Sequence, residues 1–512
     1  MRPASVCYHL NDPPATAFAW TAAQTRALDA AAIARGPDSG FDLMCRAGRS
    51  AFRLLRQRWP EARRIVVSCG GGNNGGDGLV VAALAHQQGL NVHCRILFEP
   101  DSLRGEAARA WRWAMDRGLG VVTADQPLPE QVDVIVDAVL GTGLNGPVRA
   151  HHAAELEKLA AAGAPVLAVD IPSGLHADTG QPMGPVVPAD VTLTFIGINR
   201  GLLTGQGPAF TGDLFFDRLA VSDSIYEAVG DPWKLVVPLT ELLRRLLPAR
   251  SPAAHKGSFG RVGIMGGNRG MGGALLLAAG AACRMGAGLV AALTRPEHVG
   301  PGLSRWPDVQ FLGSDDPQGL VGRLPWADVW VIGPGLGQDD WAIALLAAAC
   351  RSGKPLVLDA DALNLLAAGA VDWPDSGQWW ATPHPGEAAR LLGIAVEEVE
   401  RDRFGAIETL CDRFGGHWLL KGAGPLYAGA QVRGVVASAH ASLAKGGSGD
   451  VLSGMLGALA AQGLSGTEVI ETALVAQSCM AAWLDAHGPA HAWLASDQTD
   501  ALLHLFHDGC GT

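Results

Sequence analysis

A glycine-rich segment, AKGGSGDVLSG at residues 444–454, surrounds one carboxylate, Asp450, and leads into an apolar stretch typical of a helix. Backbone amides at the start of a helix can hold an anion, and a nearby carboxylate can take a proton from a hydroxyl group. An N-cap role would also explain Asp450, but an N-cap does not require three neighbouring glycines, each of which costs conformational entropy on folding. The segment therefore predicts phosphoryl transfer with Asp450 as the catalytic base.

Four further motifs in the second half of the chain each follow a strand-like run, so we expect them at one edge of a parallel sheet. They are VIGPGLG (331–337), VLDADALNLL (357–366), TPHPGE (382–387) and LLKGAG (419–424). Lys421 could neutralise phosphate charge or help to hold a nucleotide, whereas His384 is equally compatible with a structural role. The only Gly-Lys dipeptide is followed by Pro355, so the chain has no Walker A loop and must hold a nucleotide in another way.

The first half of the chain carries SCGGGNNGGDG at residues 68–78, between a strand-like and a helix-like run. Its glycines match the GxGxxG spacing of dinucleotide-binding turns, but the next strand offers Arg95 where an acidic residue would be expected. The motif also contains polar residues that a plain phosphate turn does not need. For Asp77, an N-cap role remains an alternative to ligand binding.

Two later strand-like runs end in polar residues. Asp137 precedes the loop 141–147, and Asp170 and Ser173 follow the next strand. Because the carboxyl ends of parallel strands line one crevice, we expect Asn74, Asp137 and Ser173 to converge as oxygen ligands. One carboxylate with neutral oxygens suits a hard, weakly charged cation better than zinc. Asp170 is then left as a candidate for proton transfer.

These motifs require two sets of alternating strands and helices to position them. The alternation runs from residue 64 to about 220 and resumes at residue 261, while residues 1–60 are predicted to be mainly helical. Continuous apolar strands between helices indicate parallel sheets covered on both faces. We therefore predict an α/β protein with a Rossmann-like, doubly wound parallel sheet followed by a second α/β domain.

Prolines at 232, 238, 248 and 252 interrupt the alternation and indicate a domain boundary. We place the first domain at residues 1–225, a linker at 226–250 and the second domain at 251–512.

The composition narrows the class of protein. A net charge of −11, from 39 basic and 50 acidic residues, disfavours nucleic-acid binding, which needs a basic surface. The nine cysteines are scattered without a CxxC pair, so we expect reduced thiols and neither a zinc site nor a disulfide framework. The N-terminus has no apolar signal core and no apolar run is long enough to span a bilayer, which predicts a cytoplasmic protein without a membrane partner.

The motifs GGGNNGGDG, DAVLGTGL and DIPSG, with the upstream segments LDAAAIARG and LMCRAG, resemble those of the NAD(P)H-hydrate epimerase family over about residues 15–220. The resemblance implies interconversion of the R and S epimers at the hydrated ring carbon of a damaged nicotinamide nucleotide. It also implies a potassium ion held by Asn74, Asp137 and Ser173, and an acid–base role for Asp170. The residues implied to bind the hydrate are Asn73, Asn74, Gly75, Gly76, Asp77, Gly141, Thr142, Gly143, Leu144, Asn145, Gly146, Pro147 and Asp170.

The second set of motifs includes HKGSFGRVGIMGG, GPGLG, LDADALN, TPHPGEAARLLG and AKGGSGDVLSG. Together these resemble the ADP-dependent NAD(P)H-hydrate dehydratase family, of ribokinase-like fold, over nearly all of residues 240–506. The resemblance implies that ADP, with Mg²⁺, phosphorylates the hydroxyl group of the S-hydrate, and that phosphate is then eliminated to give NADH or NADPH, AMP and phosphate. The hydrate would contact Ala274, Gly337, His384 and Asp450, and the adenine nucleotide would contact Lys421, Gly422, Ala423, Gly424, Pro425 and Gly449.

Two segments depart from the dehydratase pattern. The family often has an aromatic residue near Met271, and the segment HGPAHAWLASD (487–497) lacks the usual glycine–aspartate step.

Two alternatives remain open. The chain could be a small-molecule kinase of the ribokinase superfamily, of the hydroxymethylpyrimidine type, with an accessory domain. The first domain could also bind its ligand without turnover. For the assembled protein we expect a homo-oligomer.

Overall fold

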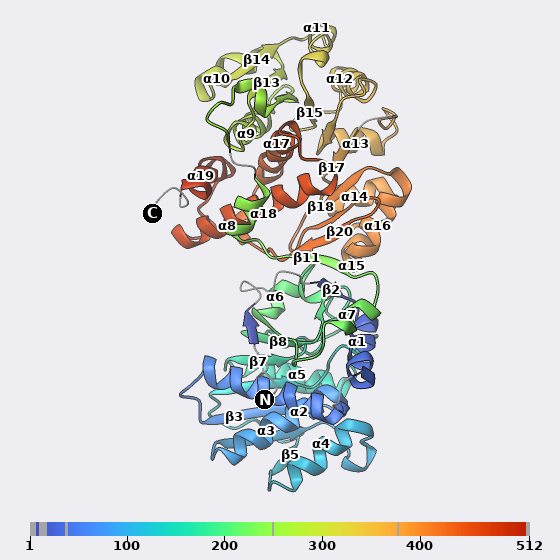
Figure 1. Cartoon of the computed structure of the whole chain (residues 1–512), viewed down its shortest axis with the longest axis vertical. Coiled ribbons are helices and arrows are strands. Elements are labelled where there is room, and N and C mark those ends of the chain that lie inside the picture. Colours follow the sequence, from blue (N-terminus) through green and yellow to red (C-terminus); the bar gives the residue numbers. More distant parts are fainter. Residues whose placement is uncertain (1–6, 10–17, 36–38, 248–249, 376–377, 508–512) are drawn as a thin grey trace. The chain divides into compact units, whose positions relative to one another are not determined.

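The computed structural model describes residues 7–9, 18–35, 39–247, 250–375 and 378–507 (Figure 1). The chain separates into two compact units, Met1–Leu235 and Val236–Thr512. The stretch expected to be a linker, 226–250, is not plain coil, because it contains the strand Trp233–Val236 and the helix Thr240–Leu246, with Trp233 and Leu243 buried. The unit boundary falls inside this stretch.

The first unit is built on an eight-stranded sheet in the order β1-β10-β8-β7-β6-β3-β4-β5, in which only β1 runs antiparallel to its neighbour. Its central strands are mainly apolar because both faces are buried: Ile65 and Val67 belong to one core, and Val66 belongs to the other. The strands are β1 (Cys7–His9), β3 (Arg64–Cys69), β4 (Asn91–Ile96), β5 (Val121–Thr123), β6 (Val134–Ala138), β7 (Val166–Val169), β8 (Val191–Phe195) and β10 (Asp213–Asp217). Outside this sheet, β2 (Phe18–Trp20) pairs with β9 (Ile198–Asn199) and with β11 (Trp233–Val236).

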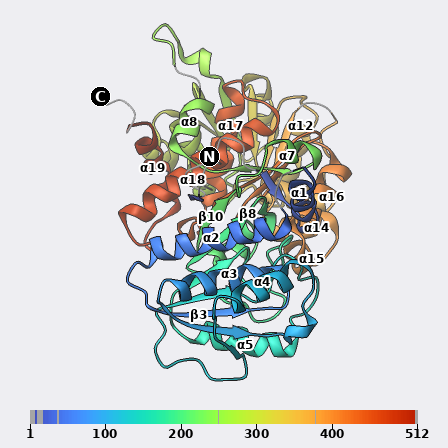
Figure 2. The same ribbon diagram turned by 60° about the horizontal axis from the view of Figure 1, so that its bottom comes forward.

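Helices cover both faces of this sheet. Figure 2 shows α2, α3 and α4 on one side of β3 and α5 on the other, which is the doubly wound arrangement predicted from the sequence. The segment 18–60 is mainly helical, as expected, where the structure describes it. The helices are α1 (Ala22–Arg35), α2 (Gly40–Arg58), α3 (Asn73–Gln87), α4 (Gly105–Met115), α5 (Ala150–Ala161), α6 (Gly207–Thr211) and α7 (Ser224–Ala228).

The strands of the second unit follow the order β14-β13-β12-β15-β16-β17-β18-β19-β20. Those from β14 to β18 are parallel, and β19 and β20 add an antiparallel extension that the strand–helix alternation did not predict. The strands are β12 (Arg261–Met265), β13 (Leu289–Thr294), β14 (Val309–Gly313), β15 (Val329–Ile332), β16 (Leu356–Leu358), β17 (Trp379–Ala381), β18 (His417–Leu420), β19 (Leu426–Ala428) and β20 (Arg433–Val436).

Helix α17 occupies the centre of the second core, where it contacts α9, α18, β12 and β15. A Cβ atom at Gly454 would overlap the carbonyl oxygen of Ala278, so glycine is what lets α17 approach α9 this closely. Trp379 and Trp380 of β17 are buried in the sheet, which indicates a packing role. The helices are α8 (Thr240–Leu246), α9 (Gly272–Arg284), α10 (Val299–Arg305), α11 (Gln318–Val321), α12 (Asp340–Cys350), α13 (Asp361–Ala367), α14 (Pro385–Leu392), α15 (Val396–Arg401), α16 (Arg403–Phe414), α17 (Ser448–Ala461), α18 (Gly466–His487) and α19 (Ala495–His507).

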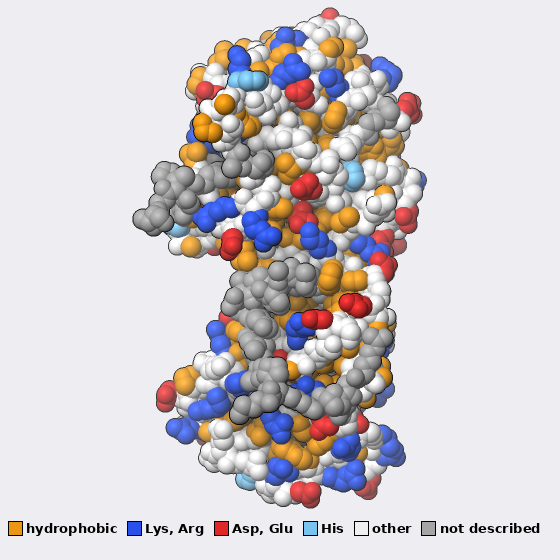
Figure 3. Space-filling view, in the orientation of Figure 1, with side chains coloured by type: hydrophobic (Ala, Val, Ile, Leu, Met, Phe, Trp, Pro, Cys, Tyr) orange, Lys and Arg blue, Asp and Glu red, His pale blue; other side chains and the backbone are white. Residues whose placement is uncertain are grey.

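The surface drawn in Figure 3 intersperses Lys and Arg with Asp and Glu side chains. Among the residues that the structure describes, no helix combines the length and the apolar character needed to cross a membrane.

Candidate functional site

The first candidate site lies where the strand order of the first sheet reverses, between β3 and β6. At such a reversal the loops that follow the two strands separate and leave a crevice for a ligand. The β3 loop is held against its neighbour by close backbone contacts: a Cβ at Gly70 would overlap the Val139 carbonyl, and one at Gly75 would overlap the Gly70 carbonyl. The glycines therefore explain how α3 can start beside the loop after β6.

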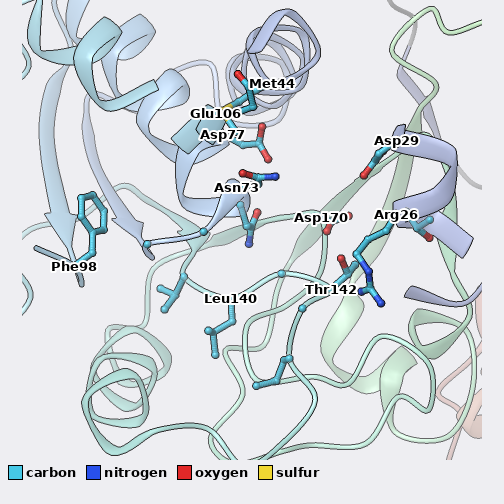
Figure 4. A pocket seen from close by; sticks show the side chains of 18 of the residues that line it. Arg26, Asp29, Met44, Asn73, Asp77, Phe98, Glu106, Leu140, Thr142 and Asp170 are labelled. Atoms are coloured by element: carbon cyan, nitrogen blue, oxygen red, sulfur yellow. The ribbon is translucent and has the colours of Figure 1, made fainter. Parts of the chain in front are cut away.

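A cavity of about 900 Å³ opens at this crevice (Figure 4). Most of the residues predicted to bind the hydrate line it, namely Asn73, Asn74, Asp77, all of Gly141–Pro147 and Asp170. Gly75 and Gly76 are buried behind the loop and are not among the lining residues. Their position favours a packing role, and direct binding by these two glycines stays a prediction.

Asp170 follows β7 and adopts a left-handed backbone conformation, with φ of +69°. Non-glycine residues in this conformation are strained by about 1–3 kcal/mol and concentrate at functional sites. Its carboxylate accepts a hydrogen bond of 3.3 Å from Thr194 Oγ1. Burial raises the pKa of Asp170 to about 6, which places its titration close to neutral pH, where a proton-transfer group is most effective.

Of the three residues predicted to hold a cation, Asn74 lines this cavity, whereas Asp137 and Ser173 are not among its lining residues. Ser173 donates to Asp137 from Oγ at 2.6 Å and from its backbone amide at 2.8 Å, and burial raises the pKa of Asp137 to about 6. The Leu140 amide donates to Ser173 Oγ at 2.8 Å, so this pair adjoins the loop that lines the cavity. Asn74 is 9% exposed, and neither polar atom of its side chain has a hydrogen-bond partner. Carboxylate, hydroxyl and amide oxygens are the ligand types that suit a weakly charged cation.

The N-cap alternative for the first motif is wrong, and the structure also shows what Arg95 does. Asp77 is not an N-cap, because α3 begins after Gly72 and Asp77 lies in its second turn. Arg95 does not face the crevice: it is fully buried and pairs with Glu155 at 2.7 Å, with Ser68 donating to the same carboxylate. Arg95 therefore has a structural role, as one partner of a buried ion pair.

The second candidate site lies at the carboxyl ends of β15, β16, β17 and β18, where the motifs were predicted to meet. Lys421 Nζ donates to Asp359 Oδ1 at 2.7 Å, and Thr382 and Ser453 also donate to this carboxylate. Although burial raises the pKa of Asp359, the Lys421 ammonium outweighs that effect and holds the pKa below its usual value. The site thus contains a buried ion pair at its base.

Asp450 is in the first turn of α17, three residues after the N-cap Gly447, which has φ of +97°. The N-cap alternative for Asp450 is therefore wrong. Burial, together with the negative charge of Asp359, raises the pKa of Asp450 to about 7, and Lys421 partly offsets the rise. A Cβ at Gly449 would lie 3.3 Å from Lys421 Nζ, so α17 brings its amides and its carboxylate next to the lysine.

The loop from Lys421 to Pro425 connects β18 to β19 and is fixed from two sides. The Lys421 amide donates to the Pro383 carbonyl at 2.9 Å, and the Gly424 amide donates to the Ser438 carbonyl at 2.7 Å. Arg403, which is 1% exposed, donates to the Lys421 carbonyl at 3.0 Å. The loop is therefore held in place by its neighbours, with Lys421 directed at Asp359.

His384 caps helix α14. Its Nδ1 accepts a hydrogen bond of 2.9 Å from the Gly386 amide, and its own amide donates to Glu387 at 2.8 Å. Burial and the nearby Lys421 lower the pKa of His384, which keeps the ring neutral at pH 7. The structural role of His384 is thus established by geometry, while half of its side chain remains exposed for a ligand.

Ala274 of α9 lies beside the loop that carries Gly337, at the reversal of strand order between β12 and β15, because a Cβ at Gly335 would lie 3.2 Å from Ala274 Cβ. Gly337 has φ of +74°, and its amide donates to Asp361 at 2.8 Å. Asn268, which is buried, supports this loop through the Leu336 carbonyl at 3.0 Å. Met271 contacts the same loop, close to Gly337.

Comparison with known proteins assigns the chain to a family. A model described as YjeF-related protein N-terminus matches residues 40–201, and one described as NAD(P)H-hydrate dehydratase matches residues 262–503. The bifunctional NAD(P)H-hydrate repair enzyme Nnr of Coxiella burnetii is 44% identical over 491 residues, covering 94% of this chain and 97% of the relative. The enzyme of the same name from Escherichia coli is 43% identical, covering 91% and 89%.

The chain belongs to the bifunctional NAD(P)H-hydrate repair enzyme family. The family prediction is therefore confirmed, and the hydroxymethylpyrimidine-type kinase is not favoured. Among solved structures, a ribokinase-like superfamily protein from Enterococcus faecalis matches with a TM-score of 0.50 and 26% identity, covering 53% of this chain and 96% of that one. This match agrees with the ribokinase-like fold expected of the second unit.

Sequence reasoning missed several residues of this repair-enzyme site. The cavity of the first unit is also lined by Asp29 of α1, by Phe98 and by His151 and His152, whose rings lie 3.9 Å apart. The adjacent histidines have no ligand spacing, and Asp29 lies inside a helix and so has no strand-end signal. In the second unit, Asp359 lay within a quoted motif but was not assigned a role.

Proposed function

We propose that this protein repairs hydrated nicotinamide nucleotides in two steps. The first unit interconverts the R and S epimers, and the second dehydrates the S epimer at the expense of ADP, giving NADH or NADPH, AMP and phosphate. The observation that carries the proposal is that relatives named as bifunctional repair enzymes align over both units, each of which presents a buried carboxylate that titrates near neutral pH.

In the second unit, Asp450 would remove the proton of the substrate hydroxyl group while the oxygen attacks the terminal phosphoryl group of ADP and AMP leaves. Lys421 would offset negative charge on the phosphates, and Mg²⁺ bound with the nucleotide would neutralise charge on the transferred group. Loss of a proton from the adjacent ring carbon and departure of phosphate then restore the double bond. Ala274, Gly337 and His384 would contact the hydrate.

The adenine nucleotide would lie on the loop Lys421–Pro425 and on the amide of Gly449 at the start of α17. Support comes from the fixed geometry of this loop and from the α17 N-terminus, where the helix dipole favours an anion. We propose ADP as the phosphoryl donor.

In the first unit, the hydrate would occupy the cavity beside Asn73, Asp77 and the loop Gly141–Pro147, with Asp170 as the proton-transfer residue. Potassium would be held by Asn74, Asp137 and Ser173, where it would offset the buried carboxylate and fix the position of Asn74. We also propose a cytoplasmic location, and a homo-oligomer stays a prediction.

The test is to incubate the protein with purified S-hydrate of NADH, ADP and Mg²⁺ and to follow absorbance at the reduced-nicotinamide band. We expect full recovery of absorbance and equimolar AMP, and a loss of at least 100-fold in the rate for Asp450→Asn. No recovery with the wild-type chain would overturn the dehydratase function. A hydroxymethylpyrimidine that is phosphorylated faster than the hydrate would favour the kinase instead.

A further inference from the structure

Helix α1 contributes a carboxyl group to the cavity of the first unit that the proposed function leaves unused. Asp29 is half-buried and lines the same cavity as Asp170 and Asp77. Figure 4 shows the three carboxyl groups around one space, where they come from α1, from the end of β7 and from α3. Asp29 and Asp170 therefore reach the space from two different elements.

The same space contains an independent sign of a ligand. Asn74 lines the cavity, is nine-tenths buried, and has no hydrogen-bond partner for either polar atom of its side chain. Buried polar groups are nearly always satisfied, so an unsatisfied amide in a cavity indicates that a bound molecule or ion completes it. The carboxyl groups thus surround a binding space rather than forming a solvated acidic patch.

Both carboxyl groups titrate near neutral pH. Burial, reinforced by the charge of Asp170, raises the pKa of Asp29 to about 7, while burial raises the pKa of Asp170 to about 6. Each group can therefore gain or lose a proton under the conditions of the reaction. A pair of carboxyl groups in which one is an acid and the other a base is the arrangement that inverting glycosidases use.

The reaction itself calls for two such groups. Hydration of a dihydronicotinamide places the hydroxyl group on a carbon bonded to the ring nitrogen. Inversion at that carbon is achieved when water leaves from one face and a second water adds from the other. A carboxyl group on one face can protonate the leaving hydroxyl group but does not reach the water that adds from the other face, so a second group on that face would accelerate the addition.

We propose that Asp29 is the second proton-transfer residue of the epimerase site and acts on the ring face opposite Asp170. In one direction, Asp170 donates a proton to the hydroxyl oxygen, the carbon–oxygen bond breaks, water leaves, and the nitrogen lone pair forms a carbon–nitrogen double bond. Water then attacks the other face, the lone pair returns to nitrogen, and Asp29 takes the proton from the attacking water. One proton passes from Asp170 to Asp29, solvent exchange resets the pair, and the reverse direction exchanges their roles.

This inference rests on the proposed epimerase function, so its test must separate the two. Purified R-hydrate of NADH is incubated with the full-length chain without ADP, and the approach to the equilibrium mixture of epimers is followed by chromatography. Wild-type, Asp29→Asn, Asp29→Glu, Asp170→Asn and Asp77→Asn are compared with Glu157→Gln, which removes an exposed carboxyl group of α5 outside the cavity. A wild-type chain that does not exceed the spontaneous rate would overturn the epimerase function.

With an active wild type, we expect Asp29→Asn to lower kcat at least 100-fold with less than a threefold change in KM, as Asp170→Asn does. Asp29→Glu keeps a carboxyl group on α1 and is expected to retain at least ten times the activity of Asp29→Asn, and Glu157→Gln is expected to match the wild type. The inference is overturned if Asp29→Asn changes only KM, if the Asn and Glu variants are equally active, or if Asp77→Asn shows the kcat loss and Asp29→Asn does not. If thermal unfolding shows that Asp29→Asn is not folded, the Asp29→Glu variant provides the test. The inference is overturned if a folded Asp29→Glu variant works only at the spontaneous rate. It is also overturned if that variant keeps both the rate and the pH dependence of the wild type.

Discussion

Asp450 works in a charge environment that its neighbours set. Asp359 lies at the base of the same site and raises the pKa of Asp450, whereas Lys421 pairs with Asp359 and limits the rise. Without the lysine, two carboxylates would face each other in a buried space. The ion pair therefore adjusts the pKa of the proposed catalytic carboxylate in addition to anchoring Lys421 of the proposed nucleotide loop.

The dehydration rate should depend on the ionisation of Asp450. As a base it is active only when ionised, and its pKa is raised to about 7, so kcat for the S-hydrate should rise with pH through about 7 and level off above it. The measurement is kcat between about pH 5 and pH 9 with saturating ADP and Mg²⁺. A rate that is flat across this range, or that falls as pH rises through 7, would contradict the role of Asp450 as the base.

The Lys421–Asp359 pair should matter for stability as well as for binding. Asp359 is 1% exposed in its side chain, so replacing Lys421 by methionine leaves a buried carboxylate without its cation, which costs about 3–5 kcal/mol. Adding Asp359→Asn to that variant removes the unpaired charge, so part of the loss should be recovered. The measurement is urea unfolding of the single and double variants.

The control for this cycle is the more exposed pair Arg433–Glu408, at 2.7 Å, whose removal should cost about 1 kcal/mol or less. Equal losses at the two pairs would show that burial does not decide the effect, and additivity of Lys421→Met and Asp359→Asn would show that the two residues are not coupled.

At the scale of elements, the position of α17 against α9 determines where Asp450 lies. Because a Cβ at Gly454 would overlap the Ala278 carbonyl, Gly454→Ala must push the helix away, although alanine has a helix propensity about 1 kcal/mol better than glycine. We expect a net destabilisation of about 2 kcal/mol or more and a lower dehydration rate. Thermal unfolding together with the S-hydrate assay measures both.

A matched control is Gly273→Ala in α9, where an added Cβ would meet no atom within 4 Å. That variant should be neutral or slightly more stable. If Gly454→Ala were also stabilising, close packing of α17 on α9 would not be what positions Asp450.

The site residues at strand ends could be predicted from the sequence because parallel strands place their carboxyl ends at one edge of the sheet. The site residues that lie within helices could not. Asp170, Asp137 and Lys421 each follow an apolar run, and parallel strands bring such positions to one edge. Asp29 and Arg403 lie in helices, and no local pattern tells which helix faces a cavity or a loop. The antiparallel strands β19 and β20 were missed because they are short and follow no helix.

For the whole molecule, the important property is that the described residues of each site belong to one unit. Every residue lining the cavity of the first site lies between Thr25 and Phe195, and the described contacts of the second site lie between Asn268 and Ser453. Each unit also has its own buried core. We therefore expect each site to work with the residues of its own unit.

A chain that lacks one activity should consequently be rescued by a chain that lacks the other. Asp170→Asn removes the epimerase carboxylate and Asp450→Asn removes the dehydratase base, so neither alone should convert R-hydrate to NADH faster than spontaneous epimerisation allows. Because the S epimer can leave one molecule and bind another, an equimolar mixture should recover about half of the wild-type rate at the same total concentration, provided that the epimers exchange freely through solution. The assay is absorbance recovery from R-hydrate with ADP and Mg²⁺, measured at several dilutions of the mixture and of the wild type. A rate per enzyme that falls steeply on dilution in the mixture alone shows that the epimer is transferred through solution. A mixture that is no faster than either variant alone would mean that the epimer passes only between the two units of one chain.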